Sequence, residues 1–305
     1  MPDNHIFSSR PPLLGLALLG LISLGCRDGA GRQAGNGLAE GPQAVRTDTA
    51  HLPHYDLAHP GVRYLGEKLR EISGIYYLAG TQTMLAENDE QGRIFTLSLA
   101  DTVSETYPSL HFGPKDDYED ITLADTTAYL LISDGEIVEV PGYAQGAEHT
   151  GRIVGQLGGT HNEFETLYYD PGRRLLVMIC KSCHHEKDQF RTAYGFDPRS
   201  RKFGDSALFR ISIPAIRQRL GDPDARFFPS AAAIHPLQKR LYILSSIGKL
   251  LVVTTLDGEV LGAYRLDPAL YRQPEGITFA PNGNMYISNE GGDGRATLLT
   301  FPYQP

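Results

Sequence analysis

Cysteine, tryptophan and basic charge are all scarce in this sequence of 305 residues, which has 3 Cys and no Trp. Its 28 Lys and Arg stand against 36 Asp and Glu, a formal net charge of −8. Three cysteines are too few for a disulfide-rich scaffold. A chain so poor in basic residues also lacks the patches that release counterions from nucleic acid, so we expect no nucleic-acid partner.

Glycine and proline are abundant instead, with 33 Gly and 20 Pro. Such a supply of turn-forming residues favours many short strands over long helices. Hydrophobic residues make up 41% of the chain and charged residues 21%, which excludes a mainly disordered protein. The length suits one large domain or two of ordinary size.

The N-terminal region contains an uncharged apolar run of 13 residues over 13–25. This run is too short for a mature transmembrane helix and is typical of a signal-peptide core. It leads into Ile22-Ser23-Leu24-Gly25-Cys26, which resembles a bacterial lipobox, the signal in which cysteine becomes the lipidated first residue. We therefore predict a signal peptide over 1–25 and a lipid anchor at Cys26, which would place the protein in the bacterial cell envelope. A plain secretory signal that is cleaved nearby is the alternative.

Residues 26–52 are rich in Gly and Ala and nearly lack large apolar side chains, which predicts a flexible tether. The folded domain is then expected over 53–305. We expect the lipid anchor to be its only contact with the membrane, and we expect a monomer.

The predicted domain contains an internal repeat of strand and turn patterns. Aligning five similar segments places five polar residues at one register: Ser73, Glu119, Glu165, Ser230 and Glu275. Their successive separations are 46, 46, 65 and 45 residues. A strand-based period of this length is typical of a β-propeller with about four strands in each blade. The long interval carries an insertion that includes a helical pattern over 213–220.

The two ends of the domain predict how the ring closes. Only 31 residues remain from Glu275 to the last residue, enough for three strands of a blade, and the segment 62–65 can supply the fourth. Pairing the two ends would hide two sheet edges. We therefore predict an all-β, five-bladed β-propeller. A six-bladed, NHL-like propeller is the alternative and would need a further repeat within the long interval.

Several stretches resemble, in order, the SdiA-regulated (YjiK-like) family of β-propeller proteins. They include Asp117-Tyr118-Glu119-Asp120-Ile121, the segment 162–170 and Gln273-Pro274-Glu275-Gly276-Ile277, with further matches at 69–75, 88–92, 233–236, 241–250 and 286–291. The resemblance covers nearly all of residues 55–303. It implies a five-bladed propeller distantly akin to NHL-repeat propellers, with a calcium site and no established biochemical activity. The sequence departs from the family pattern at Asp120 and Thr166, where Gly is favoured.

Propeller geometry predicts where the aligned residues lie. The innermost strand of a blade lines the channel and the next strand returns antiparallel, so the start of the first and the end of the second emerge on one face. We expect the aligned residues to ring one channel mouth, beside the residues that end the second strands. The ligand-facing residues predicted in this way, besides the three glutamates, are Ser73, Asn88, Asp89, Asp134, Ser230, Asn289 and Glu290.

Three glutamates that converge on a narrow mouth repel one another, and their pKa values rise unless a cation is present. Carboxylate, amide and hydroxyl oxygens suit Ca²⁺, which tolerates irregular coordination better than Mg²⁺ does. We therefore predict that Glu119, Glu165 and Glu275 bind Ca²⁺. The alternative is that each glutamate caps backbone N–H groups of a neighbouring blade.

The segment Cys180-Lys181-Ser182-Cys183-His184-His185 permits several chemistries. A disulfide between Cys180 and Cys183, or two plain thiols, is the interpretation that we favour in an exported protein. A zinc or copper site with His184 and His185 is a second interpretation, and attachment of haem c to the CxxCH pattern is a third. The pair leaves a strand rather than opening a helix, so nothing lowers the thiol pKa as a redox-active pair would require.

Two classes of function fit this sequence. The first, which we favour, is a non-catalytic, envelope-anchored, calcium-binding propeller whose channel face binds a small molecule or a protein. The second is a calcium-dependent hydrolase of the lactonase or phosphoesterase type, in which Asn88, Asp89, Asn289 or Glu290 would orient substrate or water. No GxSxG, HExxH or phosphate-binding glycine loop is present, and we predict no catalytic residue.

Overall fold

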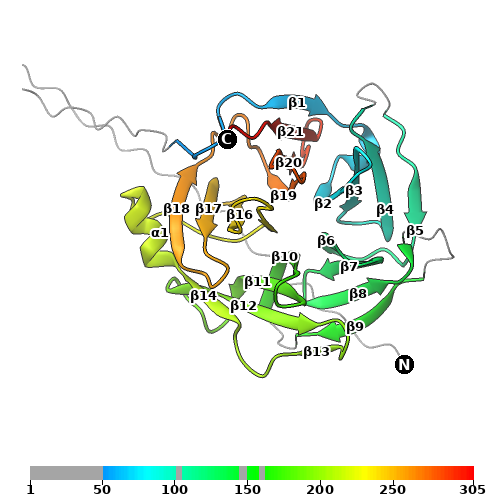
Figure 1. Cartoon of the computed structure of the whole chain (residues 1–305), viewed down its shortest axis with the longest axis horizontal. Coiled ribbons are helices and arrows are strands. Elements are labelled where there is room, and N and C mark those ends of the chain that lie inside the picture. Colours follow the sequence, from blue (N-terminus) through cyan, green and yellow to red (C-terminus); the bar gives the residue numbers. More distant parts are fainter. Residues whose placement is uncertain (1–50, 101–104, 144–149, 158–161) are drawn as a thin grey trace, which may run out of the picture. The chain divides into compact units, whose positions relative to one another are not determined.

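The computed structural model describes residues 51–100, 105–143, 150–157 and 162–305. These residues form five antiparallel sheets arranged as blades around a central channel (Figure 1). The predicted five-bladed β-propeller is confirmed, and the six-bladed alternative is wrong. The predicted signal peptide, Cys26 and most of the predicted tether lie outside the described residues. No helix among the described residues is both long enough and apolar enough to cross a membrane.

The blades follow one another along the chain, and each begins with its innermost strand (Figure 1). Blade 1 consists of β2 (Ile72–Leu78), β3 (Thr83–Asn88), β4 (Arg93–Ser98) and β5 (Ser109–His111). Blade 2 consists of β6 (Tyr118–Ala124), β7 (Thr127–Ile132), β8 (Glu136–Val140) and β9 (Arg152–Gln156). Blade 3 consists of β10 (Asn162–Asp170), β11 (Leu175–Cys183), β12 (Phe190–Asp197), β13 (Lys202–Phe203) and β14 (Phe209–Ser212). Blade 4 consists of β15 (Ala231–Ile234), β16 (Leu241–Ser245), β17 (Leu250–Thr254) and β18 (Val260–Arg265).

Blade 5 combines the two ends of the domain. Its inner strands are β19 (Pro274–Phe279), β20 (Met285–Asn289) and β21 (Thr297–Phe301), and its outer strand is β1 (Gly61–Tyr64) from the start of the domain. The pairing continues beyond β1, where the Leu65 N–H donates to the Ala296 carbonyl at 2.8 Å. This closure was predicted from the sequence and is confirmed. A short 3₁₀ helix, η1 (Glu67–Leu69), then leads into blade 1.

The insertion in blade 3 accounts for the long repeat interval. Strand β12 pairs with β14 along its first half and with β13 at its end, so two short strands share the outer edge. The predicted helix follows as α1 (Ile213–Leu220). Its N-terminus is capped by Ser212 Oγ, which accepts a hydrogen bond from the Ala215 N–H at 3.2 Å, and Gly221 ends it in the left-handed conformation, φ 61°.

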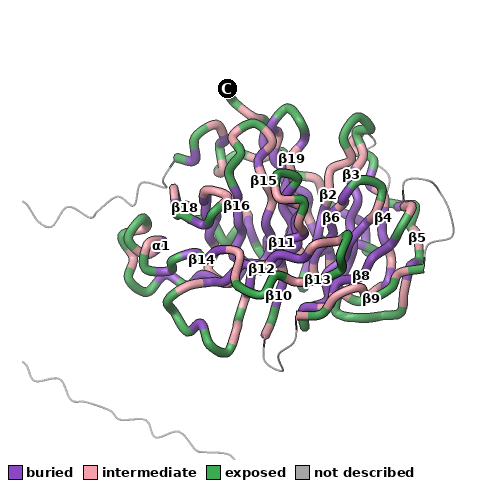
Figure 2. The backbone as a smooth tube through the Cα atoms, turned by 60° about the horizontal axis from the view of Figure 1, so that its bottom comes forward, coloured by how far each residue is buried: buried purple, intermediate pink, exposed green. Residues whose placement is uncertain are grey.

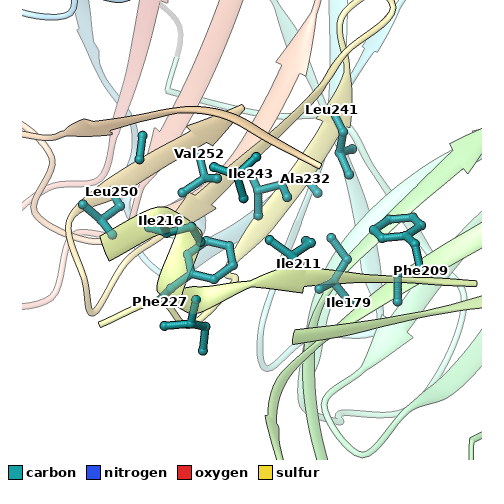
Figure 3. Packing of buried hydrophobic residues seen from close by; sticks show 14 of the residues in the cluster. Ile179, Phe209, Ile211, Ile216, Phe227, Ala232, Leu241, Ile243, Leu250 and Val252 are labelled. Carbon is teal, nitrogen blue, oxygen red and sulfur yellow. The ribbon is translucent and has the colours of Figure 1, made fainter. Parts of the chain in front are cut away.

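The hydrophobic core consists of five clusters, each between two neighbouring blades. Each blade therefore buries both of its faces, and exposed residues collect in the turns and outer strands (Figure 2). The cluster between blades 3 and 4 extends to the insertion, where Ile216 of α1 and Phe227 pack near Ile243 and Val252 of blade 4 (Figure 3). This packing holds the inner strands, and hence the channel, in a fixed arrangement.

Candidate functional site

One channel mouth is built from the starts of the inner strands and the ends of the second strands. Backbone hydrogen bonds link these segments from blade to blade. The Tyr118 N–H, at the start of β6, donates to the Asp89 carbonyl after β3, and the Phe164 N–H in β10 donates to the Ser133 carbonyl after β7, both at 2.9 Å. The two kinds of segment therefore meet on one face, as propeller geometry predicts.

A β-bulge places each of the three predicted glutamates in its strand. In β6, Tyr118 pairs with Ile132 and Asp120 with Leu131, so Glu119 is an extra residue without a partner across the ladder. Glu165 in β10 and Glu275 in β19 occupy the same position in their own strands. A bulge bends the strand and redirects the side chain of the extra residue. The three glutamates that share one register in the sequence repeat are therefore also the three bulge residues of their strands.

The three glutamates line a single cavity of about 410 Å³ at this mouth. The cavity brings together six carboxyl groups and two lysines, a formal excess of four negative charges. Its lining residues are Asp89, Asp117, Glu119, Glu165, Lys181, Ser246, Ile247, Lys249, Gln273, Glu275 and Glu290. We call it the acidic mouth. Among the predicted ligand-facing residues, Asp89 and Glu290 belong to it.

Burial and mutual repulsion shift the titration of these carboxyl groups. Burial, followed by the charges of Glu165 and Asp117, raises the pKa of Glu119 to about 9. Burial, with Glu165 and Glu290, raises the pKa of Glu275 to about 8. The pKa of Glu290 rises to about 7, chiefly through burial and then the nearby Asp89. At neutral pH several of these groups therefore hold protons unless a cation replaces them.

Lys181 supplies positive charge inside the acidic mouth. Its ammonium group forms an ion pair with Glu165, and the Glu163 carboxylate lies 4.0 Å from the same nitrogen. The Glu165 side chain is 13% exposed, so this pair is largely shielded from water. Lys249 points its ammonium at a different acceptor, the Arg272 carbonyl, at 2.5 Å. Lys181 thus offsets one carboxylate and leaves the others in excess.

Five of the predicted ligand-facing residues are placed elsewhere, in hydrogen bonds that hold the scaffold. Ser73 and Ser230 are 2% and 1% exposed, and Ser230 Oγ donates to the Pro274 carbonyl in blade 5. The buried Asn88 donates to the Lys68 carbonyl, and the buried Asn289 donates to Thr297 Oγ1. Asp134 accepts from the Glu136 N–H in a turn.

Six residues of the acidic mouth are not among the site residues predicted from the sequence, and two of them, Asp117 and Lys181, act on the charge of the glutamates. Asp117 precedes Glu119 by two positions, and the period-two alternation of a strand could have nominated it. Lys181 lies between the two cysteines, and its role depends on the hairpin that brings it back toward Glu165. The charge of Lys181 becomes part of the site only through the pairing of β10 with β11.

Two further carboxyl groups are buried beside the inner strands. The Asp120 carboxyl accepts a hydrogen bond from the Leu167 N–H of blade 3 at 2.7 Å and another from the N–H of the next residue, Ile121, at 2.8 Å. Asp120 therefore links blades 2 and 3. The Glu87 carboxyl accepts the Gly74 N–H at 2.6 Å, and burial raises its pKa well above the usual range. Backbone capping of a neighbouring blade, the alternative role for the glutamates, is thus carried out here by Asp120. A side chain at Gly74 would clash, because its Cβ would lie 2.6 Å from Asp120 Cα.

Cys180 and Cys183 are joined in a disulfide, with their Cα atoms 6.0 Å apart. In this oxidised form neither sulfur is a thiolate that could bind zinc or a thiol that could attach haem. The Glu186 carboxylate approaches the same sulfurs, and potential ligand atoms of all three residues lie within 4.8 Å of one another. The haem and zinc interpretations, with His184 as a ligand, therefore apply only to the reduced chain and remain untested predictions.

The donor set of the acidic mouth suits a hard divalent cation. All of its negatively charged groups offer carboxylate oxygen, the ligand type that Ca²⁺ prefers. Asp89 supplies a separate indication, because its Oδ1 atom is buried and has no hydrogen-bond partner among the described residues. An orphaned buried carboxylate oxygen is costly unless something pairs with it. The residues present therefore fit Ca²⁺.

No protein-family model matches the chain, and no curated protein matches its sequence. Solved structures are similar in fold. Glutaminyl cyclase from Myxococcus xanthus is 14% identical, with a TM-score of 0.53 over 81% of this chain and 97% of the cyclase. A luciferin-regenerating enzyme is 12% identical, with a TM-score of 0.49 over 80% of this chain and 95% of its own. A Bacteroides thetaiotaomicron protein of unknown function is 16% identical, with a TM-score of 0.46 over 76% of this chain and 55% of its own.

At these identities the similarity concerns the β-propeller fold alone. The family resemblance noted in the sequence remains a prediction.

Proposed function

We propose that this protein is a calcium-binding β-propeller of the SdiA-regulated type, with a non-catalytic binding role in the bacterial cell envelope. The observation that carries the proposal is the acidic mouth, where six carboxyl groups share a cavity with two lysines. Glu119, Glu165 and Glu275 would hold the ion together with Asp89 and Glu290. The bound ion would relieve their repulsion and link blades 1, 2, 3 and 5, which supply these residues.

Calcium binding can be tested by isothermal titration calorimetry at pH 8, with elemental analysis of the purified protein. We expect one equivalent of Ca²⁺ per chain. Glu275→Gln removes one charge from the mouth while keeping the side-chain shape, and we expect it to weaken Ca²⁺ binding at least tenfold, about 1.4 kcal/mol.

Glu259→Gln is the matched control, because Glu259 is exposed in the turn between β17 and β18. It should bind Ca²⁺ as the wild type does. The proposal fails if the wild type binds no Ca²⁺, or if Glu259→Gln and Glu275→Gln weaken binding equally.

A hydrolase remains the second candidate, and Glu290 is the residue that favours it. A carboxyl group with a pKa of about 7 can accept a proton at neutral pH, and Gln273 Nε2 orients this one by donating to its Oε2 atom at 2.8 Å. A panel of lactones and phosphoesters, assayed with Ca²⁺ and after chelation, tests this function. Turnover that disappears in Glu290→Gln but survives in Glu259→Gln would support a hydrolase, and no turnover across the panel would eliminate it.

The envelope location rests on Cys26 and the apolar segment before it. Expression of the full chain in a bacterium, followed by mass spectrometry of the mature N-terminus, tests this part of the proposal. We expect a diacylglyceryl-modified Cys26 in the membrane fraction, and release of Cys26→Ser from the membrane. An unmodified N-terminus at another residue would indicate the plain secretory signal.

A further inference from the structure

The channel has a second cavity, at the end opposite the acidic mouth. Its volume is about 440 Å³, within the range of small-molecule binding sites. It is lined by the later residues of all five inner strands and by the turns that follow them. The acidic mouth is lined by the starts of three of these strands, β6, β10 and β19, and by residues at or after the ends of the second strands. We call this second cavity the aromatic funnel. None of the residues that we assign to calcium lines it.

The floor of the aromatic funnel is apolar at every blade. In each of the five blades, the residue two positions after the aligned polar residue lines this cavity. These residues are Ile75, Ile121, Leu167, Ala232 and Ile277, and each is at most 4% exposed. Along each inner strand these residues follow the register of the glutamates, and no described residue lines both the funnel and the acidic mouth, so the two cavities are separate candidate sites.

The next ring, two residues further on, is rich in aromatic side chains. It consists of Tyr77, Leu123, Tyr169, Ile234 and Phe279, all partly exposed. Tyr77 is braced by Tyr286, whose ring stacks on it with the centroids 5.8 Å apart. Braced aromatic walls around an apolar floor favour a flat, apolar ligand, because ring faces offer a large contact area at little entropic cost.

Besides the tyrosines, the polar side chains that line the funnel are Asp120, Thr122 and Thr278 in its interior and Asp125 and Lys239 near its opening. Tyr76, between the two rings, lines the cavity and is partly exposed, so its phenol group can donate a hydrogen bond to a ligand oxygen or nitrogen, whereas Tyr168 is buried between blades 3 and 4. At the rim, Asp125 and Lys239 are exposed and of opposite sign. In the interior, both carboxyl oxygens of Asp120 already accept backbone N–H groups, from Ile121 and Leu167, so a charged ligand would lose its hydration there without a free group to pair with it.

We propose that the aromatic funnel is a binding site for an uncharged small molecule that contains an aromatic ring system. The ligand lies along the channel axis with its rings against Tyr77, Tyr169 and Phe279 and its inner end on the apolar floor. A polar atom of the ligand accepts a hydrogen bond from Tyr76. This site is independent of calcium, because no described residue lines both the funnel and the acidic mouth.

The test uses two fluorescent probes. N-phenyl-1-naphthylamine is uncharged and joins a phenyl ring to a naphthyl ring, and its 8-sulfonate has the same ring system with a negative charge. Fluorescence titration of the wild type should show one saturable site for the neutral probe and at least tenfold weaker binding of the sulfonate. Equal affinity for the two probes would overturn the uncharged class, and the lack of a saturable site for the neutral probe would overturn the proposal.

Matched substitutions locate the probe. Ile234→Lys puts a charge among the residues that surround the funnel together with Tyr77, Tyr169 and Phe279. Leu237→Lys puts the same charge three residues away, at a 52% exposed position outside the cavity lining. We expect Ile234→Lys to weaken binding of the neutral probe at least tenfold and Leu237→Lys to leave it unchanged. Leu123→Lys, in blade 2, repeats the test should Ile234→Lys fail to fold.

Glu275→Gln should bind the probe as the wild type does, so failure of the calcium proposal would not affect this result. Equal losses in Leu237→Lys and Ile234→Lys would contradict the proposed location, as would loss of probe binding in Glu275→Gln.

Discussion

At Lys181 a positive charge lies among six carboxyl groups, and it pairs with one of them, Glu165. A divalent cation in the acidic mouth must therefore share the cavity with an ammonium group. Close like charges repel in a partly shielded cavity more strongly than in water. The sequence indicates the glutamates but not this counter-charge, because the charge of Lys181 matters only once β11 has folded back on β10.

Removing the charge at Lys181 should strengthen calcium binding. In Lys181→Met the apolar stem is kept and Glu165 loses its partner, so one more carboxylate is available to the ion. We expect the affinity for Ca²⁺ to rise about tenfold, or about 1.4 kcal/mol, in a calorimetric titration at pH 8.

Lys239→Met is the control for Lys181→Met, since Lys239 lies at the rim of the aromatic funnel. It should leave the affinity for Ca²⁺ unchanged. Weaker calcium binding by Lys181→Met would mean that Lys181 organises the ligands rather than competing with the ion.

At the scale of single elements, strand β1 decides whether the ring is closed. It is an outer strand that pairs only with β21 among the described strands. The hydrogen bond from the Leu65 N–H to the Ala296 carbonyl shows which N–H groups along β1 point toward β21. Because these groups alternate in direction, the Arg63 N–H faces β21, whereas the Val62 N–H faces away from it. Proline lacks this N–H and is tolerated in an edge strand only where the N–H faces solvent.

Arg63→Pro should therefore weaken the closure, and Val62→Pro should be tolerated much better. We expect Arg63→Pro to lower the melting temperature by at least about 2–4 °C, the shift for a loss of about 1 kcal/mol in a domain of this size class. Arg63→Ala separates the backbone effect from the side chain, which donates to the Ser98 carbonyl. Equal melting temperatures for Arg63→Pro and Arg63→Ala would show that the ladder contributes little to closure.

The number of blades, the closing strand and the helix could be predicted from the sequence, whereas the surroundings of individual side chains could not. The repeat period predicts five blades, the end segments predict the closure by β1, and a helical pattern predicts α1 where it lies. These features follow from local patterns of apolar and turn residues. Ser73 and Ser230 share the register of the glutamates, yet they are buried in contacts between blades. Their different surroundings arise from packing against a neighbouring blade, which no local pattern records.

At the scale of the whole molecule, the acidic mouth should make stability depend on pH and on metal. Carboxyl groups whose pKa is raised in the folded state bind protons more tightly there than in the unfolded chain. Their contribution to stability is fully present below the ordinary pKa of a carboxyl group and is lost as the pH rises through the folded values. Those values are about 6 for Asp89, 7 for Glu290, 8 for Glu275 and 9 for Glu119.

The titration of His235 sets the lower limit of the pH range in which the acidic mouth alone should govern the change in stability. Burial lowers its pKa to about 4, so its contribution is lost only as the pH falls below 6.5, the ordinary value for histidine. Between pH 6.5 and 9 the melting temperature of the metal-free protein should therefore fall as the pH rises, and Ca²⁺ should restore it most at pH 9.

Glu119→Gln should flatten this pH dependence, because it removes a carboxyl group whose pKa is raised to about 9. Differential scanning calorimetry with and without a chelator measures both effects. A melting temperature that rises with pH over this range without metal would contradict the proposed repulsion in the mouth.

The number of blades, the closure of the ring and the register at which three glutamates recur can all be predicted from the amino-acid sequence. This is possible because a blade is a local unit of alternating strands and turns that repeats along the chain. Two features emerge only in the folded chain. Bulges place Glu119, Glu165 and Glu275 in one cavity with Lys181, and apolar and aromatic residues line the opposite end of the channel. Both cavities are made from residues of all or most blades, brought together around one axis, and the charge or apolarity that each gathers exists only when the ring is closed.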